Sequence, residues 1–175
     1  MSARQALPNW LPPVSREEFI QAMRGVANSV SVVTTRSENT IHGATVSAFC
    51  SVSADPPTVL VCLKSDSRIA REVLENRNFC VNVVPDSAGT IADRFAGHHD
   101  STVSDRFEGI GYLDDHRLPP VIDDSCAFSC ELDSSHTAAS HTILVGRVTS
   151  VCHGMQKPLL WLDGEYCVPV PNNRS

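Results

Sequence analysis

The 175-residue sequence has no long apolar run, and its first residues lack a basic stretch followed by an apolar segment. A membrane-spanning helix needs about 20 apolar residues, and a secretory leader needs both of those N-terminal features. We therefore expect neither a transmembrane segment nor a leader. Basic residues are also sparse, because 14 Lys and Arg accompany 20 Asp and Glu, for a net charge of -6. Nucleic-acid-binding surfaces need clustered Lys and Arg, so we expect no nucleic-acid partner.

The sequence also lacks the short motifs of several common enzyme classes. It contains no G-x-G-x-x-G, no phosphate-binding P-loop, no G-x-S-x-G and no H-E-x-x-H. These absences argue against a Rossmann dinucleotide fold, a P-loop nucleotide hydrolase, an α/β-hydrolase and a zinc peptidase. Any dinucleotide would have to be bound by a different kind of fold.

The cysteine pattern favours buried free thiols in a reducing cytoplasm. The number of cysteines is odd and most stand in apolar, strand-like runs, at Cys50, Cys62, Cys80, Cys126, Cys130, Cys152 and Cys167. No second metal-type pair accompanies Cys126 and Cys130, so we do not expect a zinc site. The hydrophobic share of 42% and the chain length fit a single domain.

The stretch from Gly43 to Pro57 has the most informative pattern. Even positions from Ala44 to Val52 are small and apolar, whereas most odd positions carry hydroxyls, at Thr45, Ser47, Ser51 and Ser53. Successive side chains of a strand point to opposite faces, so the pattern predicts one long strand with a hydroxyl-lined face. A planar ligand that forms several hydrogen bonds would fit this face. An ordinary half-exposed strand with its hydroxyls turned to water is the alternative.

Local signals predict three short helices. Ser15 and Glu18 form a capping box before apolar residues at helical spacing, which predicts a helix over residues 16–27. A second helix begins near Ser67, and a third covers residues 88–95. Gly97 ends the third helix.

The start of the second helix has two possible uses. Its free amides, together with a hydroxyl and the cations of Lys64 and Arg68, could bind a phosphate. Plain N-capping by Asp66 or Ser67 is the commoner use of such residues. Different hydroxyls can serve each purpose, so both roles can coexist.

The remaining apolar runs predict strands that follow one another without regular helical crossovers. They cover residues 29–35, 58–63, 79–84, 126–132, 141–152 and 166–168, and the polar residues 98–108 and 133–140 predict loops. The 58–63 strand is apolar on both faces, so we expect it to be central and buried. The order of elements predicts a mainly β fold, an antiparallel barrel with short peripheral helices. It occupies residues 15–170, between an N-terminal arm (1–14) and a C-terminal tail (171–175).

Several segments together resemble the flavin reductase family. The run S-A-F-C-S-V-S-A-D-P-P-T-V-L-V-C-L is similar to a strand pair of these proteins, the small reductase components of two-component flavin-dependent monooxygenases such as those acting on 4-hydroxyphenylacetate. Further similar segments, in the same order, are residues 19–35, A-D-R-F-A at 92–96, H-T-I-L-V-G-R-V at 141–148 and P-L-L-W-L-D-G-E-Y ending at 166. The resemblance implies a Greek-key split β-barrel of the flavin-mononucleotide-binding type, usually a homodimer. It also implies FAD or FMN and NADH, or NADPH, as ligands.

The resemblance also implies positions for both ligands. The flavin ring would contact Thr45, Val46, Ser47 and Ala48, with Ser51 and Ser53 extending the contact, and its ribityl phosphate would lie along Cys62, Lys64, Ser67 and Arg68. His141 and Tyr166 would lie near the nicotinamide. From the residues alone, an exposed histidine at a strand start and a packed tyrosine remain the alternatives. Hydride transfer needs no protein acid or nucleophile, so we expect no catalytic residue in the strict sense.

The leading functional hypothesis is an NAD(P)H-dependent reductase that releases reduced flavin to a partner monooxygenase. A reductase that keeps its flavin and passes electrons to another acceptor, such as a corrinoid or a quinone, is a second hypothesis. A non-catalytic flavin-binding module is a third. The colour of the purified protein and the need for added flavin separate the first two, and NADH oxidation with added flavin separates the third.

Overall fold

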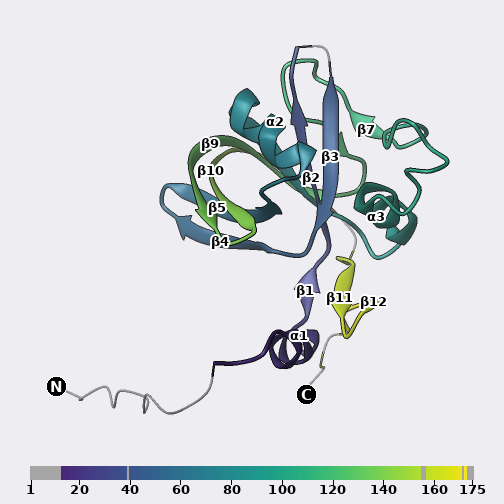
Figure 1. The fold of residues 1–175 in the computed structure, drawn as a ribbon. Coiled ribbons are helices and arrows are strands. Elements are labelled where there is room, and N and C mark those ends of the chain that lie inside the picture. The colour runs from purple at the N-terminus through teal and green to yellow at the C-terminus, as the bar shows by residue number, and fades with distance from the viewer. Residues whose placement is uncertain (1–12, 39, 155–156, 171, 173–175) are drawn as a thin grey trace.

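The computed structural model describes residues 13–38, 40–154, 157–170 and 172 (Figure 1). Its helices are α1 (Arg16–Arg24), α2 (Arg68–Asn76) and α3 (Gly89–Ala96). The strands are β1 (Asn28–Ser29), β2 (Ser31–Arg36), β3 (Ile41–Val46), β4 (Phe49–Ala54), β5 (Pro57–Lys64), β6 (Asn78–Val83), β7 (Tyr112–Leu113), β8 (Val121–Ile122), β9 (Cys126–Ala138), β10 (His141–Cys152), β11 (Leu160–Leu162) and β12 (Glu165–Cys167). Most of the predicted arm and tail lies outside the described residues.

One seven-stranded sheet forms the body of the molecule. Its strand order is β3-β2-β6-β9-β10-β5-β4, and every neighbouring pair is antiparallel. Two small sheets, β1-β11-β12 and β7-β8, lie beside it. The predicted mainly β, antiparallel architecture with a few short helices is therefore confirmed. Within the described ranges, none of the helices is long and apolar enough to cross a bilayer.

The long strand predicted over residues 44–52 is wrong, because the chain breaks it at Ser47 and Ala48. The two halves, β3 and β4, lie at opposite edges of the seven-stranded sheet. The break also changes which side chains face the core: Ala44 and Val46 pack against it in β3, whereas Phe49 does so in β4. Cys50 and Val52, expected on the apolar face, are exposed.

Two further strand predictions need correction. β5 is not central but second from an edge, and only alternate residues such as Val61 and Leu63 are buried. The polar residues 133–140 do not form a long loop, since β9 continues to Ala138 and pairs with β10.

The burial of the thiols also differs from expectation. All seven cysteines are free, but Cys80 and Cys130 alone among them are buried.

The helices begin at the predicted signals. Ser15 and Glu18 form a complete capping box at the start of α1, but the helix ends at Arg24, three residues earlier than predicted. Ser67 caps α2, and Gly97, with φ of 90°, ends α3 in the left-handed conformation. Local hydrogen-bonding signals thus determine where α1 and α2 start, whereas α3 begins without a side-chain cap.

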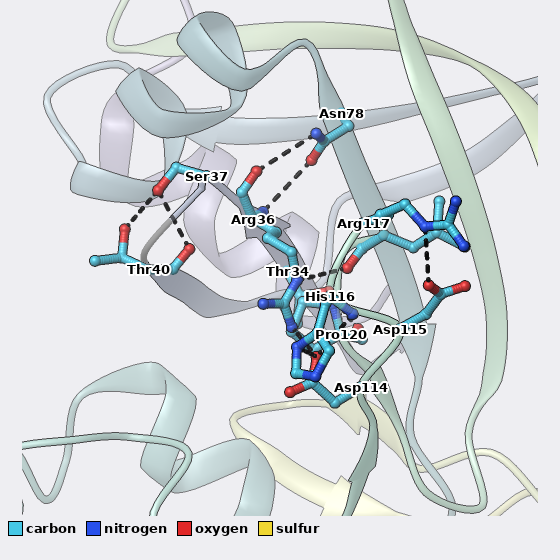
Figure 2. A network of polar contacts seen from close by, with 11 residues as sticks. Thr34, Arg36, Ser37, Thr40, Asn78, Asp114, Asp115, His116, Arg117 and Pro120 are labelled. Atoms are coloured by element: carbon cyan, nitrogen blue, oxygen red, sulfur yellow. Dashed lines mark hydrogen bonds and ion pairs between the residues drawn. The ribbon is translucent and has the colours of Figure 1, made fainter.

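Two hydrophobic clusters hold the sheet to its helices. Consecutive residues of β2 belong to different clusters. Val33 is in the same cluster as Val73 of α2, and Val32 is in the same cluster as Phe95 of α3. Figure 2 shows polar contacts that tie the β2–β3 hairpin to the 114–120 segment, where Arg36 donates to the carbonyl of Leu118 and pairs with Asp114. The hairpin therefore projects as an anchored element rather than a free one.

We predict that Gly146→Ala lowers the free energy of unfolding by about 1–3 kcal/mol, the usual cost of overpacking a core. Gly146 lies on β10 where a Cβ atom would overlap the ring of Phe79 and come within 2.9 Å of Cys130 Cβ. Phe79 is fully buried, so its ring has little room to move. Urea denaturation measures the change. Gly25→Ala is the control, because its new Cβ would meet its nearest atom at 3.5 Å, and equal stability of the two variants would contradict the prediction.

Candidate functional site

A pocket of about 430 Å³ opens where β3 passes into β4, and we call it the seam pocket. Its walls come from β3, the 47–48 corner, the end of β5, the start of α2, the end of α3 and the start of β10. It is lined by Ala44, Thr45, Val46, Ser47, Ala48, Cys62, Leu63, Lys64, Ser67, Ile69, Phe95, Ala96, Arg106 and His141. Eight of the twelve residues predicted from the sequence to bind flavin or nicotinamide are among them.

The other four predicted residues lie outside the seam pocket. Arg68 lines a cavity that adjoins it. Ser51 and Ser53 are exposed on β4, and the hydroxyl of Ser53 caps the following turn by donating to the carbonyl of Asp55 at 2.9 Å. Tyr166 donates its hydroxyl to Asp93 of α3 at 2.8 Å. The ligand roles of these residues stay predictions.

The backbone of the 47–48 corner is fixed to β5 by a hydrogen bond. The amide of Cys62 donates to the carbonyl of Ala48 at 3.0 Å, which ties the corner to β5. Among the strands that the structure describes, β3 pairs only with β2. Its other edge therefore presents backbone N–H and C=O groups, of which the Gly43 carbonyl accepts a hydrogen bond from Arg106. Ser47 and Ala48 are both small and exposed. A flat ligand with hydrogen-bonding edges can therefore approach the backbone here.

Two of the hydroxyls predicted to bind the ligand form hydrogen bonds within the fold. Thr45 Oγ1 donates to the carbonyl of Ala92 at 2.6 Å, which joins β3 to α3. Ser67 Oγ donates to the carbonyl of Lys64 at 2.6 Å and accepts the amide of Ala70 at 3.3 Å. The capping use of Ser67 is confirmed, and its hydroxyl proton is already engaged. A phosphate at this end would depend mainly on the cations of Lys64 and Arg68.

Lys64 and His141 bring polar groups to one end of the seam pocket. They are direct partners across β5 and β10. Both side chains are exposed, and His141 Nδ1 lies 3.0 Å from Ser140 Oγ. This end can meet an anionic or amide-bearing ligand, whereas Val46, Leu63 and Ile69 add apolar surface to the lining.

Arg106 is a lining residue that the sequence did not reveal, because it stands in a polar segment predicted to be a loop. Its Nη1 donates to the carbonyls of Gly43 at 3.2 Å and Phe95 at 2.9 Å. Its Nε and Nη2 donate to the two carboxylate oxygens of Asp100 at 2.9 and 2.6 Å. The arginine thus fixes β3, α3 and the 97–108 segment to one another. Next to it, Phe107 is buried in the core.

Burial and neighbouring groups shift the pKa values of three side chains near the site. Burial, with the nearby thiol of Cys50, raises the pKa of Cys62. Burial and the bond to Asp93 raise the pKa of Tyr166 to about 12. Burial, followed by the charge of Arg68, lowers the pKa of His42. All three groups therefore favour their neutral forms near pH 7.

Known proteins share the sequence pattern of this chain. Residues 23–169 match the model of the flavin reductase like domain. The chain belongs to this family. It is 31% identical to the FMN reductase (NADH) RutF of Pseudomonas syringae pv. syringae over 156 residues, which cover 87% of this chain and 86% of that protein. The resemblance inferred from the sequence is confirmed.

Solved structures of the flavin reductase family have the same fold. Flavin reductase PheA2 in its native state superposes with a TM-score of 0.81 at 28% identity, covering 90% of this chain and 100% of that one. The styrene monooxygenase flavin reductase SMOB of Pseudomonas putida S12 superposes with a TM-score of 0.77 at 28% identity, covering 87% and 98%. Both proteins are named flavin reductases, and both have this arrangement of strands.

We predict that Ala48→Trp raises the flavin dissociation constant at least about tenfold, or about 1.4 kcal/mol. The indole would fill the seam pocket at a position that is exposed, so folding should be unaffected. Fluorescence titration with flavin measures the affinity, and circular dichroism checks the fold. Ala54→Trp, exposed at the far end of β4, is the control. An unchanged affinity in Ala48→Trp would remove the corner from the flavin site.

Proposed function

We propose that this protein is an NADH-dependent flavin reductase that supplies reduced flavin to a partner monooxygenase. The observation that carries the proposal is the seam pocket, in which the predicted flavin residues of β3 and β5 meet the predicted nicotinamide residue His141. The relatives add support, because their names combine NADH, flavin reduction and, for one of them, a monooxygenase. NADPH remains the alternative electron donor.

The residues present fit a flavin. The pocket volume of about 430 Å³ lies within the range of small-molecule sites. The free edge of β3 and the small side chains of Ser47 and Ala48 suit a flat ring with hydrogen-bonding edges. Lys64 places a cation where the ribityl phosphate is expected. FAD and FMN share these parts, so the seam pocket suits either.

The chain's own contribution to the reaction is positioning. When bound, a flavin supplies the electron sink for a hydride from the reduced nicotinamide. The β3 edge would orient the ring, and the apolar side chains of Val46, Leu63 and Ile69 would exclude water from it. His141 would hold the nicotinamide by a hydrogen bond at the open end. No side chain is required to donate or remove a proton for the hydride step itself.

We predict that His141→Ala lowers kcat/KM for NADH by roughly tenfold to a hundredfold, the effect of losing one positioning contact of about 1–3 kcal/mol. Flavin affinity should change little, because the flavin is expected to bind through the backbone and side chains of residues 45–48 and Lys64 rather than through the imidazole. Stopped-flow reduction of bound flavin over an NADH titration measures the hydride step directly.

His136→Ala is the matched control for this experiment. His136 is also an exposed histidine of the β9–β10 hairpin, opposite Ile143, but it does not line the seam pocket. Its reduction rates should equal those of the wild type. Wild-type rates in His141→Ala across the whole titration would show that the histidine has no role in NADH use.

We also propose a split β-barrel and a C2 homodimer with the flavin near the interface. The proposal is supported by α1, which has no buried residue, and by Phe19 and Met23 on it, which are 60% and 44% exposed. A nine-residue helix is not stable by itself in water, so its apolar side chains need a partner surface. Cys50 and Val52 of the edge strand β4 are also exposed. The seven free thiols further support a reducing, cytoplasmic setting.

We predict that sedimentation equilibrium gives a dimer at micromolar concentration and that Phe19→Glu shifts it toward monomer. A charge at the centre of an apolar contact is left without water or a counter-ion, which opposes association. Glu17→Ala, on the same helix, is the control and should remain dimeric. A fully active wild-type monomer at micromolar concentration would contradict the prediction.

A further inference from the structure

A second cavity of about 500 Å³ adjoins the seam pocket, and the proposed reductase function gives it no role. It is formed by the first half of β3, the first residues of α2 and the 100–107 segment. The two cavities share Ala44, Ser67, Ile69 and Arg106. They therefore adjoin along these four residues.

The shared wall lies at the end where the flavin phosphate is expected. Ser67 lines both cavities, Lys64 lines the seam pocket, and Arg68 lines the second cavity. A ligand with its ring at the β3 edge and its phosphate between Lys64 and Arg68 would direct any group beyond that phosphate into the second cavity. FMN ends at this phosphate. FAD continues with a second phosphate and an adenosine.

The charges of the second cavity suit a neutral group with hydrogen-bond donors. Its cation Arg106 is already paired with Asp100. Arg68 contacts His42 at 2.9 Å and lies 3.5 Å from Glu72, but its side chain is 66% exposed and can still meet a phosphate at the cavity's edge. The carboxylate of Asp105 also lines the cavity. Carboxylates accept hydrogen bonds from ribose hydroxyls, and they oppose a terminal phosphate dianion deep in the cavity. An adenosine has the donors and the neutrality that this lining requires.

We propose that the second cavity binds the adenosine of FAD, so that this protein uses FAD in preference to FMN. The inference rests on the proposed flavin reductase function and specifies its substrate. Its volume is within the range of small-molecule sites, and Ile41, Val103 and Phe107 give it an apolar wall for the base. Arg68 at the junction supplies a cation for the pyrophosphate.

The test blocks the second cavity without entering the first. Val103 is half-buried and lines the second cavity but not the seam pocket. Val103→Trp would place an indole where the adenosine is expected. Ser104→Trp, at an exposed position of the same lining, is a second blocking variant in case the first does not fold. Ser101→Trp is the control, since it adds the same bulk to the same segment at an exposed position outside both linings.

Dissociation constants for FAD and FMN are measured by flavin fluorescence titration, without NADH, and kcat/KM for each flavin is measured with NADH. We expect the wild type to bind FAD at least about tenfold more tightly than FMN, or about 1.4 kcal/mol. Each blocking variant should abolish this preference, and Ser101→Trp should keep it. The ratio of the two dissociation constants is the readout, because a general loss of structure would weaken both flavins alike.

Several results would overturn the assignment. Equal affinities of the wild type for FAD and FMN would do so, and so would blocking variants that weaken both flavins equally. A raised KM for NADH with an unchanged flavin ratio would assign the cavity to the adenosine of the nicotinamide dinucleotide instead. A preference for FAD without oxidation of either NADH or NADPH would refute the reductase function and leave the cavity assignment standing. Absence of binding to either flavin would refute both.

Discussion

A two-residue connection constrains the whole sheet. Ser47 and Ala48 join β3 to β4, which are the two outermost strands in the order β3-β2-β6-β9-β10-β5-β4. In a flat sheet, six spacings of about 4.8 Å would separate these edges by about 29 Å. From Val46 to Phe49 the chain can reach only about 11 Å. The sheet must therefore curl until its edges meet at this corner, and the bond from the Cys62 amide to the Ala48 carbonyl fixes the meeting point.

The seam pocket is a consequence of that curl. Where the edges meet without pairing, β3 keeps free backbone groups, and the small side chains of the corner leave space beside them. α3 and the 97–108 segment close the outer side, joined by Thr45 to Ala92 and by Arg106 to Gly43 and Phe95. A Cβ atom on Gly43 would come within 2.6 Å of the Phe95 ring, so the close packing of α3 on β3 requires a glycine at this position. β3 therefore carries both the backbone groups expected to meet a ligand and groups that bond within the fold.

The sequence predicted those elements whose signals are local. Helix starts followed from Ser15, Glu18 and Ser67, because a cap and the spacing after it lie within a few residues. The range 141–152 of β10 was predicted as observed. The break at residues 47–48 was missed, since neither glycine nor proline marks it and the alternation continues across it. The polar end of β9 was also missed, because its strand conformation depends on pairing with β10.

The site shows the same division between local and long-range information. Family resemblance, rather than the hydroxyl pattern, identified the residues that gather in the seam pocket, and two of the expected hydroxyls bond within the fold. Arg106 escaped prediction because the carbonyl that it binds on Gly43 is 63 residues away in sequence. No local pattern distinguishes such an arginine from a solvated one. Its role follows only from the curl that brings β3 to the 97–108 segment.

The chemistry explains why the site has so few distinctive side chains. Hydride transfer between two bound rings requires close, dry alignment rather than an acid, a base or a nucleophile. The raised pKa of Cys62 agrees with this, since a thiol that stays protonated near pH 7 is a poor nucleophile beside a reactive ring. Side-chain volume at the corner then matters more than side-chain chemistry. Specificity for one flavin over another can instead come from the charged side chains of Lys64 and Arg68, on either side of Ser67. Beyond this point, FAD and FMN differ in length, and the chain can recognise that difference.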